Sequence, residues 1–355
     1  FNKCTSLLNI SGLAVAMAAV ILILLWVQNE TRYDKYHPDA ERIYLLTEYD
    51  LEKAAYTMET SPYLAAAAVK ASIPEAEMIG MAQQATFYSP LFTIEGQSFK
   101  EKNALYVDTG WVRMFHYELL AGSLEAFIHN PHSLLISASK AKQYFGSKSP
   151  LEQVIHIDSL AYSIAGVIKD PPAYSSFGQD VLISVTAHPN YSDYINAGNW
   201  GAYSQSLFIK LSDQAATKVV EEKIASIFAA NQPWRKDNTP QHRLIPLQDL
   251  HFKQELNSRF IKHGNPQNIR IFSILAALLL VTACINFINL SIARIAVRLK
   301  EIGIRKIVGA AKGQLFMQVM TETAIAVLIA MGMALLAAII ALPFFNGFTE
   351  RNFIL

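Results

Sequence analysis

Cysteine is scarce in this chain of 355 residues, which contains two, Cys4 and Cys284. Two cysteines cannot build a disulfide framework, so the class of disulfide-stabilised small domains is excluded. Charged residues make up 17% of the sequence, whereas ordinary soluble domains have roughly a quarter. The net charge is +1, and a general nucleic-acid binder would carry a basic excess. We therefore expect no nucleic-acid partner, and the hydrophobic content of 52% indicates a membrane protein.

The sequence also lacks the motifs of common enzyme classes. The segments GSKSP at Gly146 and GAAKGQ at Gly309 do not have the full glycine-lysine-serine spacing of a phosphate-binding loop. The patterns GxSxG, HExxH and CxxC are absent. His129 and His132 form a close pair, but two ligands without a third nearby do not fix a metal, so we favour a polar loop. The sequence therefore predicts no catalytic residue, no metal site and no enzymatic activity in this chain.

Three long runs without charge dominate the hydropathy pattern. They contain 26 residues from Cys4 to Asn29, 23 from Ile271 to Ala293 and 27 from Thr323 to Thr349. About 20 helical residues cross a bilayer core, so each run is long enough, and a buried soluble helix is the weaker interpretation. The first run is longer than a signal-peptide core and no small-x-small site follows it, which favours an uncleaved anchor. We assign membrane helices to residues 1–29, 271–293 and 323–348.

The loop between the second and third helices, residues 294–322, indicates the orientation. It carries six cations and two acidic residues. Short loops rich in cations remain in the cytoplasm. Residues 30–270 are therefore expected on the opposite side of the membrane, where residues 349–355 would begin a truncated external loop.

The external region has the alternating pattern of a large α+β domain, which we expect to contain two subdomains. Helical periodicity and stop signals predict helices over Ser61–Ser72, Ser139–Phe145 and Asp213–Ala230. Short apolar runs between turn residues predict strands. These runs are Ala104–Val107, Ser133–Ser137, Val154–Ile157, Tyr162–Ile168, Val181–Val185 and Ser206–Leu211.

Polar and small residues inside the membrane segments indicate a helix bundle. Asn286 and Asn289 are three residues apart, on one face of the second helix. They could contact a substrate, but an interhelical hydrogen bond is the preferred interpretation, because amides in lipid are costly without a partner. The third helix is rich in small residues, including Gly332, which permit close packing. We therefore predict helix packing at Asn286, Asn289 and Gly332.

The cytoplasmic loop carries apolar residues at helical spacing among its cations. A solvated loop that only fixes the orientation would need the cations alone. Residues such as Ile304 and Ile307 therefore indicate docking into a groove on a partner or contact with the membrane surface.

The sequence KEIGIRKIVGA, which follows a helix ending in CINFINLSIAR, resembles the signature of MacB/FtsX-type ABC transporter permeases. The N-terminal NISGLAVAMAAVILILLWVQNETRYDKYHPDAERIY resembles the first helix of that family and its extension. The segments LISASKAKQYFG and YSIAGVIKDPPAYSSF resemble motifs of the MacB-like periplasmic core domain. The resemblance covers essentially the whole chain. It implies a multi-pass protein of the bacterial inner membrane, and an N-terminal fragment, because the family core has four membrane helices.

The resemblance also implies partners and a mechanism. A separate cytoplasmic ABC ATPase would bind ATP and Mg²⁺, and this chain would bind no cofactor. Other expected partners are a second permease unit (as a homodimer or a fused second half), membrane lipid, and periplasmic or outer-membrane proteins. ATP hydrolysis would move the periplasmic domain by mechanotransmission in efflux, lipoprotein release or envelope remodelling. The residues that the resemblance assigns to ATPase coupling are Glu301, Ile302, Gly303, Ile304, Arg305, Lys306, Ile307 and Gly309.

Two other classes of protein are alternatives to this interpretation. A membrane-anchored sensor or receptor would also place an external domain between two helices. The third helix and the short loop before it argue against a sensor. An enzyme with an external active site would need a catalytic constellation, and the sequence has none.

Overall fold

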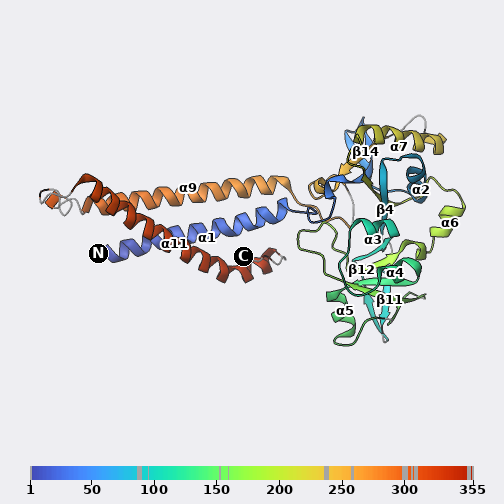
Figure 1. The fold of residues 1–355 in the computed structure, drawn as a ribbon, viewed down its shortest axis with the longest axis horizontal. Coiled ribbons are helices and arrows are strands. Elements are labelled where there is room, and N and C mark those ends of the chain that lie inside the picture. Colours follow the sequence, from blue (N-terminus) through green and yellow to red (C-terminus); the bar gives the residue numbers. More distant parts are fainter. Residues whose placement is uncertain are drawn as a thin grey trace. The chain divides into compact units, whose positions relative to one another are not determined.

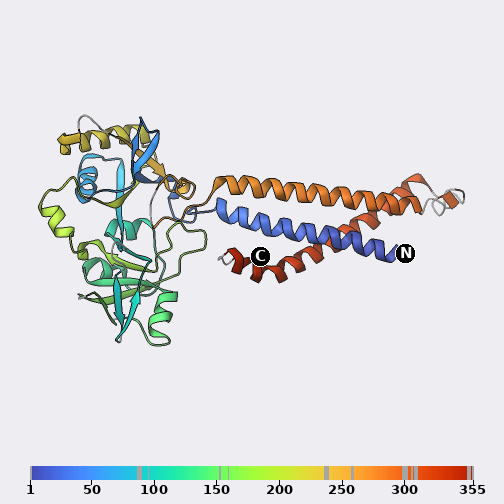
Figure 2. The ribbon, with the colours of Figure 1, turned by 180° about the vertical axis from the view of Figure 1, so that it is seen from behind.

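The computed structural model describes residues 2–85, 90–94, 96–151, 153–158, 160–235, 240–256, 260–297, 303–304, 307, 311–349 and 353. The chain divides into two compact units. One consists of Phe1–Thr31 with Asn265–Leu355, and the other is Arg32–Gly264. The first unit is helical and the second combines strands and helices (Figures 1 and 2).

The helical unit contains α1 (Asn2–Thr31), α9 (Pro266–Val297) and α11 (Lys312–Thr349). Each of these helices is long and apolar enough to cross a membrane. Helix α1 packs against both α9 and α11. At the contact with α11, Ala330, Ala334 and Ala338 are fully buried in one cluster with Leu13 and Ala14 of α1. Because small side chains let helix backbones approach closely, this spacing of four residues explains the bundle predicted from the sequence.

Among the described residues of the domain, fourteen strands form one sheet. Their order is β14-β1-β13-β4-β7-β12-β9-β11-β10-β5-β6, while β2, β3 and β8 pair with β1, β13 and β11 respectively. The pairs β7–β12 and β9–β11 are parallel. The strands are β1 (Ile43–Asp50), β2 (Ala55–Met58), β3 (Ser61–Pro62), β4 (Ala76–Gln84), β5 (Leu91–Ile94), β6 (Gln97–Lys100), β7 (Ala104–Val107), β8 (Leu119–Gly122), β9 (Ser133–Ser137), β10 (Val154–Ile157), β11 (Leu160–Ile168), β12 (Val181–Ser184), β13 (Tyr203–Leu211) and β14 (Gln241–Pro246).

The domain helices form two groups along this sheet (Figure 1). One group packs near β4, β13 and β14, and the other near β9 and β11. Hydrogen bonding between β4 and β7 joins them, so the two expected subdomains share one sheet. The helices are α2 (Tyr63–Ser72), α3 (Thr109–Met114), α4 (Leu124–His129), α5 (Ala138–Phe145), α6 (Tyr191–Asn196), α7 (Thr217–Asn231) and α8 (Leu247–Leu250), with short 3-10 turns η1 (Ala40–Arg42), η3 (Val185–Ala187) and η4 (Pro233–Arg235).

The central strands bury side chains on both faces of the sheet. In β7, Ala104 and Tyr106 belong to one core cluster, and Leu105 and Val107 belong to the other. Successive side chains of a strand point to opposite faces, so a continuous apolar run fits a strand that is covered on both sides. All five residues of β9 are buried for this reason. The mixed α+β class predicted from the sequence is confirmed.

Candidate functional site

The segment between α9 and α11 contains the residues that the sequence assigned to coupling. Gly303, Ile304 and Ile307 have helical backbone. The side chain of Ile304 is 62% exposed and that of Ile307 is 87% exposed. The other assigned positions lie outside the described residues; they are Glu301, Ile302, Arg305, Lys306 and Gly309. Two exposed isoleucines three residues apart fit an apolar anchor that a partner or lipid would cover.

Exposed apolar side chains also occur in the first turns of α11. Phe316 and Met317 are each 62% exposed, and Met320 is 45% exposed. Phe316 and Met320 are four residues apart, so they lie on the same side of the helix. The first turns of α11 therefore add apolar side chains that a partner or lipid would cover.

The contact between α1 and α9 depends on a buried amide that the sequence analysis did not single out. Asn9 of α1 is 2% exposed, and its Nδ2 donates to the Phe287 carbonyl and to Ser291 Oγ, both at 3.4 Å. Further along, the rings of Trp26 and Phe272 meet edge to face, with centroids 5.0 Å apart. These contacts pair the start of α1 with the end of α9, so the two helices are antiparallel.

The residues predicted to pack the bundle lie elsewhere on these helices. Asn286, Asn289 and Gly332 are all exposed within this chain. A Cβ added at Gly332 would meet no atom within 4 Å. The interhelical hydrogen bond expected of Asn286 and Asn289 is made by Asn9 instead, because Phe287 and Ser291 face α1 and the two asparagines do not. Within this chain all three residues are therefore exposed, and their role in helix packing stays a prediction.

The histidine pair of the α4 region has ordinary surface contacts. His129 Nε2 lies 3.3 Å from Glu125 Oε2 and is 79% exposed. The ring of His132 meets that of Tyr162 at 5.4 Å. In the part of the chain that the structure describes, no group of three or more His, Cys, Asp or Glu side chains could hold a metal ion.

A second candidate site lies in the domain, at the segment that directly follows α1. Asp34 is fully buried in a left-handed conformation, with φ of 56°. Its Oδ1 accepts a hydrogen bond from the backbone N–H of Ser176 at 2.8 Å. The Ser176 carbonyl in turn accepts from the backbone N–H of Lys262, at 2.9 Å, shortly before α9. One short segment thus bonds to both ends of the domain.

Burial raises the pKa of the Asp34 carboxyl to about 6, while the hydrogen bond from Ser176 and the positive charges of His251 and Lys262 lower it in part. Burial also lowers the pKa of the neighbouring His37 to about 4. Sequence analysis missed this site. Its one sequence signal is the aromatic-rich RYDKYHPDAERIY, in which an aspartate follows a membrane helix directly.

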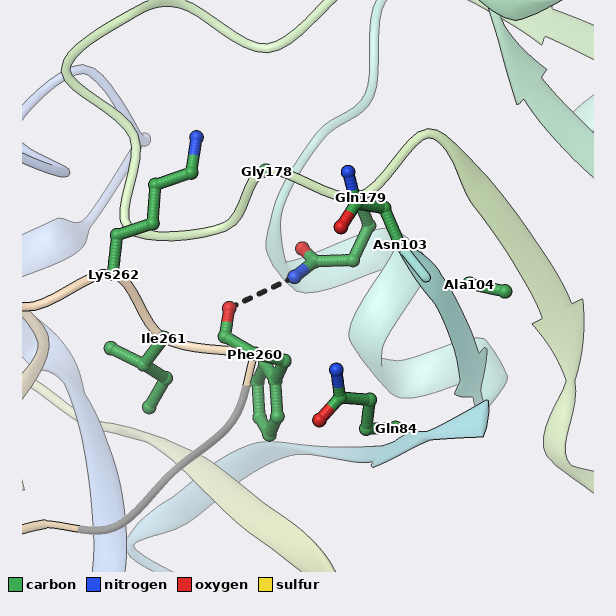
Figure 3. Close-up of a pocket in the computed structure, with 8 residues that line it drawn as sticks. All are labelled: Gln84, Asn103, Ala104, Gly178, Gln179, Phe260, Ile261 and Lys262. Carbon is green, nitrogen blue, oxygen red and sulfur yellow. Dashed lines mark hydrogen bonds between the residues drawn. The ribbon is translucent and has the colours of Figure 1, made fainter. Parts of the chain in front are cut away.

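A pocket of about 80 Å³ lies beside these contacts (Figure 3). Gln84, Gln179 and Lys262 are among its lining residues, and Gln179 Nε2 donates to the Phe260 carbonyl at 2.9 Å. Pockets for drug-sized ligands have volumes of roughly 300–1,000 Å³. This pocket is therefore too small to enclose a large transported molecule.

Comparisons with known proteins match both units of the chain. The MacB-like periplasmic core domain family matches residues 6–227, and the FtsX-like permease C-terminal family matches residues 273–355. A macrolide export ATP-binding/permease protein MacB from Bdellovibrio bacteriovorus is 26% identical over 53% of this chain and 28% of its own length. The MacB of Haemophilus ducreyi is 25% identical over 60% of this chain and 29% of its own length. The chain thus spans less than a third of these relatives.

A solved domain of a permease protein from Porphyromonas gingivalis has the same fold. It aligns with a TM-score of 0.50 at 22% identity, covering 59% of this chain and 92% of that domain. The core-domain family alone matches more than half of the residues, and the curated relatives are named as ATP-binding/permease proteins. The chain therefore belongs to the MacB/FtsX family of ABC transporter permeases, and it is an inner-membrane protein with a periplasmic domain.

Proposed function

We propose that this permease is a mechanotransmitter, in which ATP hydrolysis by a separate cytoplasmic ATPase moves α1 and α9 and, through them, the periplasmic domain. The observation that carries the proposal is the exposure of Ile304 and Ile307 in the segment between α9 and α11. Exposed apolar side chains at helical spacing suit the groove of a partner protein. The assignment of the residues from Glu301 to Gly309 to ATPase coupling is part of this proposal.

The side of the membrane on which the segment is expected supports this partner. The periplasmic domain lies between α1 and α9 in the chain. If α9 crosses the membrane, the segment that follows it lies in the cytoplasm. The cations of residues 294–322 favour the same side. A cytoplasmic ATPase would meet the permease there.

ATP and Mg²⁺ would bind to the ATPase and not to this chain. The 355 residues contain no complete phosphate-binding loop. The curated relatives are named as ATP-binding/permease proteins and are more than three times as long as their match to this chain. The proposal assigns the permease role to this chain and the ATP-binding role to a partner.

The exposed surface of the helix bundle supports further proposed partners. Asn286 and Asn289 are exposed on α9, and amides facing lipid are costly unless another helix covers them. A second permease unit, as a homodimer or a fused half, would supply such a helix, and lipid would cover the apolar remainder. Periplasmic or outer-membrane proteins would act with the domain in efflux, lipoprotein release or envelope remodelling.

The test is recovery of the ATPase with purified permease variants. Ile304→Asp and Ile307→Asp place a charge where the partner would bury an apolar anchor, so each should strongly reduce recovery. Truncating a buried interface anchor typically costs about 2 kcal/mol or more, whereas changes to rim charges cost much less. Lys312→Ala, a nearby exposed cation, is the matched control and should leave recovery unchanged.

Membrane fractionation of each variant separates the two interpretations of the loop. Normal insertion with loss of the ATPase supports docking. Undiminished recovery of the ATPase with both isoleucine variants would show that these residues are not the docking element. A loop that only rests on lipid would lose membrane contact and keep its partner.

A further inference from the structure

The segment from Tyr174 to Gln179, called here the junction segment, is bonded to the chain that leaves α1. The backbone N–H of Asp34 donates to the Tyr174 carbonyl at 3.0 Å, and Ser176 donates its N–H to Asp34 Oδ1 at 2.8 Å. Tyr36 Oη donates to Ser175 Oγ at 2.9 Å. Asp34, Ser175 and Ser176 have no exposed surface. Three successive contacts therefore fix the junction segment to the residues that follow α1.

The same segment is bonded on its other side to the chain that enters α9. Lys262 donates its backbone N–H to the Ser176 carbonyl at 2.9 Å. Phe177 and Ile261 form an antiparallel bridge. Gln179 Nε2 donates to the Phe260 carbonyl at 2.9 Å (Figure 3). The junction segment thus lies between two other segments and is hydrogen-bonded to both, although these two neighbours are more than 200 residues apart in the chain.

The two outer segments are also joined through His251. The ring of Tyr33 stacks on the imidazole of His251, with centroids 3.4 Å apart and planes 12° apart. His251 Nδ1 shares a hydrogen bond with the Lys262 carbonyl at 2.9 Å, and the Gly264 N–H donates to the His251 carbonyl at 2.7 Å. The residues that follow α1 are therefore held against those that precede α9.

The junction segment leads from these contacts into the middle of the sheet. Phe177 is 4% exposed and meets Trp111, Phe115 and Phe208 edge to face, with centroids 5.0–5.7 Å apart. Immediately afterwards, the Asp180 N–H donates to the Asn103 carbonyl at 3.1 Å, beside the parallel pair β7 and β12. A displacement of the junction segment would therefore act on the aromatic core and on the central strands.

We call the junction segment and its two hydrogen-bonded neighbours, the chain that leaves α1 and the chain that enters α9, the splice. We infer that the splice stays intact throughout the ATP cycle. It would hold the chain that leaves α1 and the chain that enters α9 together as one rigid body, whose movement is passed to the sheet. The inference deepens the proposed function and depends on it. Asp34 is a positioning residue in this account, because it acts by holding Ser176 in place. Buried hydrogen bonds resist separation, since breaking them leaves polar groups without water or partner.

The test uses the full chain in complex with its ATPase, with spin labels on non-cysteine handles at Gln97 of β6 and Phe348 of α11. Both positions are exposed. The distance between the labels is measured without nucleotide and after trapping with ADP and vanadate. A change in this distance reports movement of the domain relative to α11. The variants are Asp34→Ala, which removes the acceptor for Ser176, and Asp34→Asn, which keeps an acceptor oxygen.

A disulfide crosslink tests whether these contacts have to open during the ATP cycle. Antiparallel partners have Cα atoms about 4.5–5.5 Å apart, within the range that a disulfide spans. The pair Phe177→Cys with Ile261→Cys, in a chain with Cys4 and Cys284 replaced by alanine, can therefore lock the junction segment to the chain that enters α9. The same variant measured after addition of reductant is the control, because it lacks Phe177 but has no crosslink.

We expect the distance change to be lost in Asp34→Ala, kept in Asp34→Asn, and kept in the unsubstituted Asp34 chain when the crosslink is oxidised. Rescue by Asp34→Asn, which keeps the acceptor for Ser176, separates positioning from a merely structural defect. A full distance change in Asp34→Ala would overturn the inference. The inference would also be overturned if the oxidised crosslink by itself abolished the distance change and reductant restored it. That result would mean that the splice has to open during the cycle. Absence of any change in the unmodified complex would instead contradict the proposed function.

Discussion

Tyr33 and His251 are 218 positions apart in the chain, yet their rings stack at 3.4 Å. Tyr33 comes two residues after α1 ends, and His251 lies in the segment that leads to α9. Tyr33 is 3% exposed and His251 is 1% exposed. This stack therefore places the two ends of the periplasmic domain in direct contact, away from water.

Tyr33→Ala should destabilise the domain strongly. Truncating a buried aromatic side chain to alanine costs about 3–5 kcal/mol, because contacts are lost and a cavity remains. Tyr33→Phe keeps the ring and should cost much less. Urea unfolding of the full chain in detergent, followed by a domain signal, measures both. Equal stabilities of the two variants would show that the ring stack contributes little.

Asp108 caps α3 and also holds β4. Its Oδ1 accepts from the backbone N–H groups of Met81 and Trp111, both at 2.8 Å. Asp108→Ala would leave two donors without this acceptor, so we expect a loss of roughly 1–3 kcal/mol in the free energy of unfolding. Asp108→Asn retains an acceptor oxygen and should recover most of it. Equal losses in both variants would mean that the hydrogen bonds are not the source of the stability.

His242 should make the domain less stable in mild acid. Burial lowers its pKa from an ordinary 6.5 to about 4. Between these values the unfolded chain binds a proton that the folded chain does not, so the contribution is present above pH 6.5 and lost as pH falls toward 4. The shift corresponds to about 3 kcal/mol at most. Comparing unfolding free energies against pH for the unmodified chain and His242→Leu isolates this contribution, and parallel curves would contradict it.

The small face of α11 should not tolerate a large side chain. Ala334 is fully buried against α1, so Ala334→Leu overpacks the contact, at a cost of roughly 1–3 kcal/mol. Gly332→Leu is the matched control, because Gly332 is exposed with open space around it. Thermal unfolding in detergent should show a lower midpoint for Ala334→Leu alone. Similar midpoints for the two variants would place the α1 contact on another face.

Local sequence patterns predicted the central strands well. Ala104–Val107 and Ser133–Ser137 match β7 and β9 residue for residue, because strands buried on both faces are continuous apolar runs. The pattern failed for β1, where Glu48 interrupts the apolar run. Glu48 is 3% exposed there because Arg235 binds both of its carboxylate oxygens, at 2.7 and 3.0 Å. A partner 187 positions away leaves no local signal.

The absence of local signals for long-range contacts also explains which site residues could be predicted from the sequence. Helical spacing showed that Asn286 and Asn289 share a face, but it could not say which face meets α1. β4 was missed partly because it contains Gly80, and glycine is uncommon inside strands. The folded domain needs glycine at this position, because a Cβ there would come within 2.9 Å of the Trp111 Cα. The splice around Asp34 depends on three segments that meet only in the folded domain.

The measurement that tests the central claim most directly is the distance between labels at Gln97 and Phe348 in the unmodified permease–ATPase complex. If ATP hydrolysis moves the periplasmic domain, the distance distribution should differ between the nucleotide-free state and the state trapped with ADP and vanadate. Ile304→Asp, which should release the ATPase, should abolish the difference. Identical distributions in a complex whose ATPase is demonstrably trapped would contradict mechanotransmission by this chain.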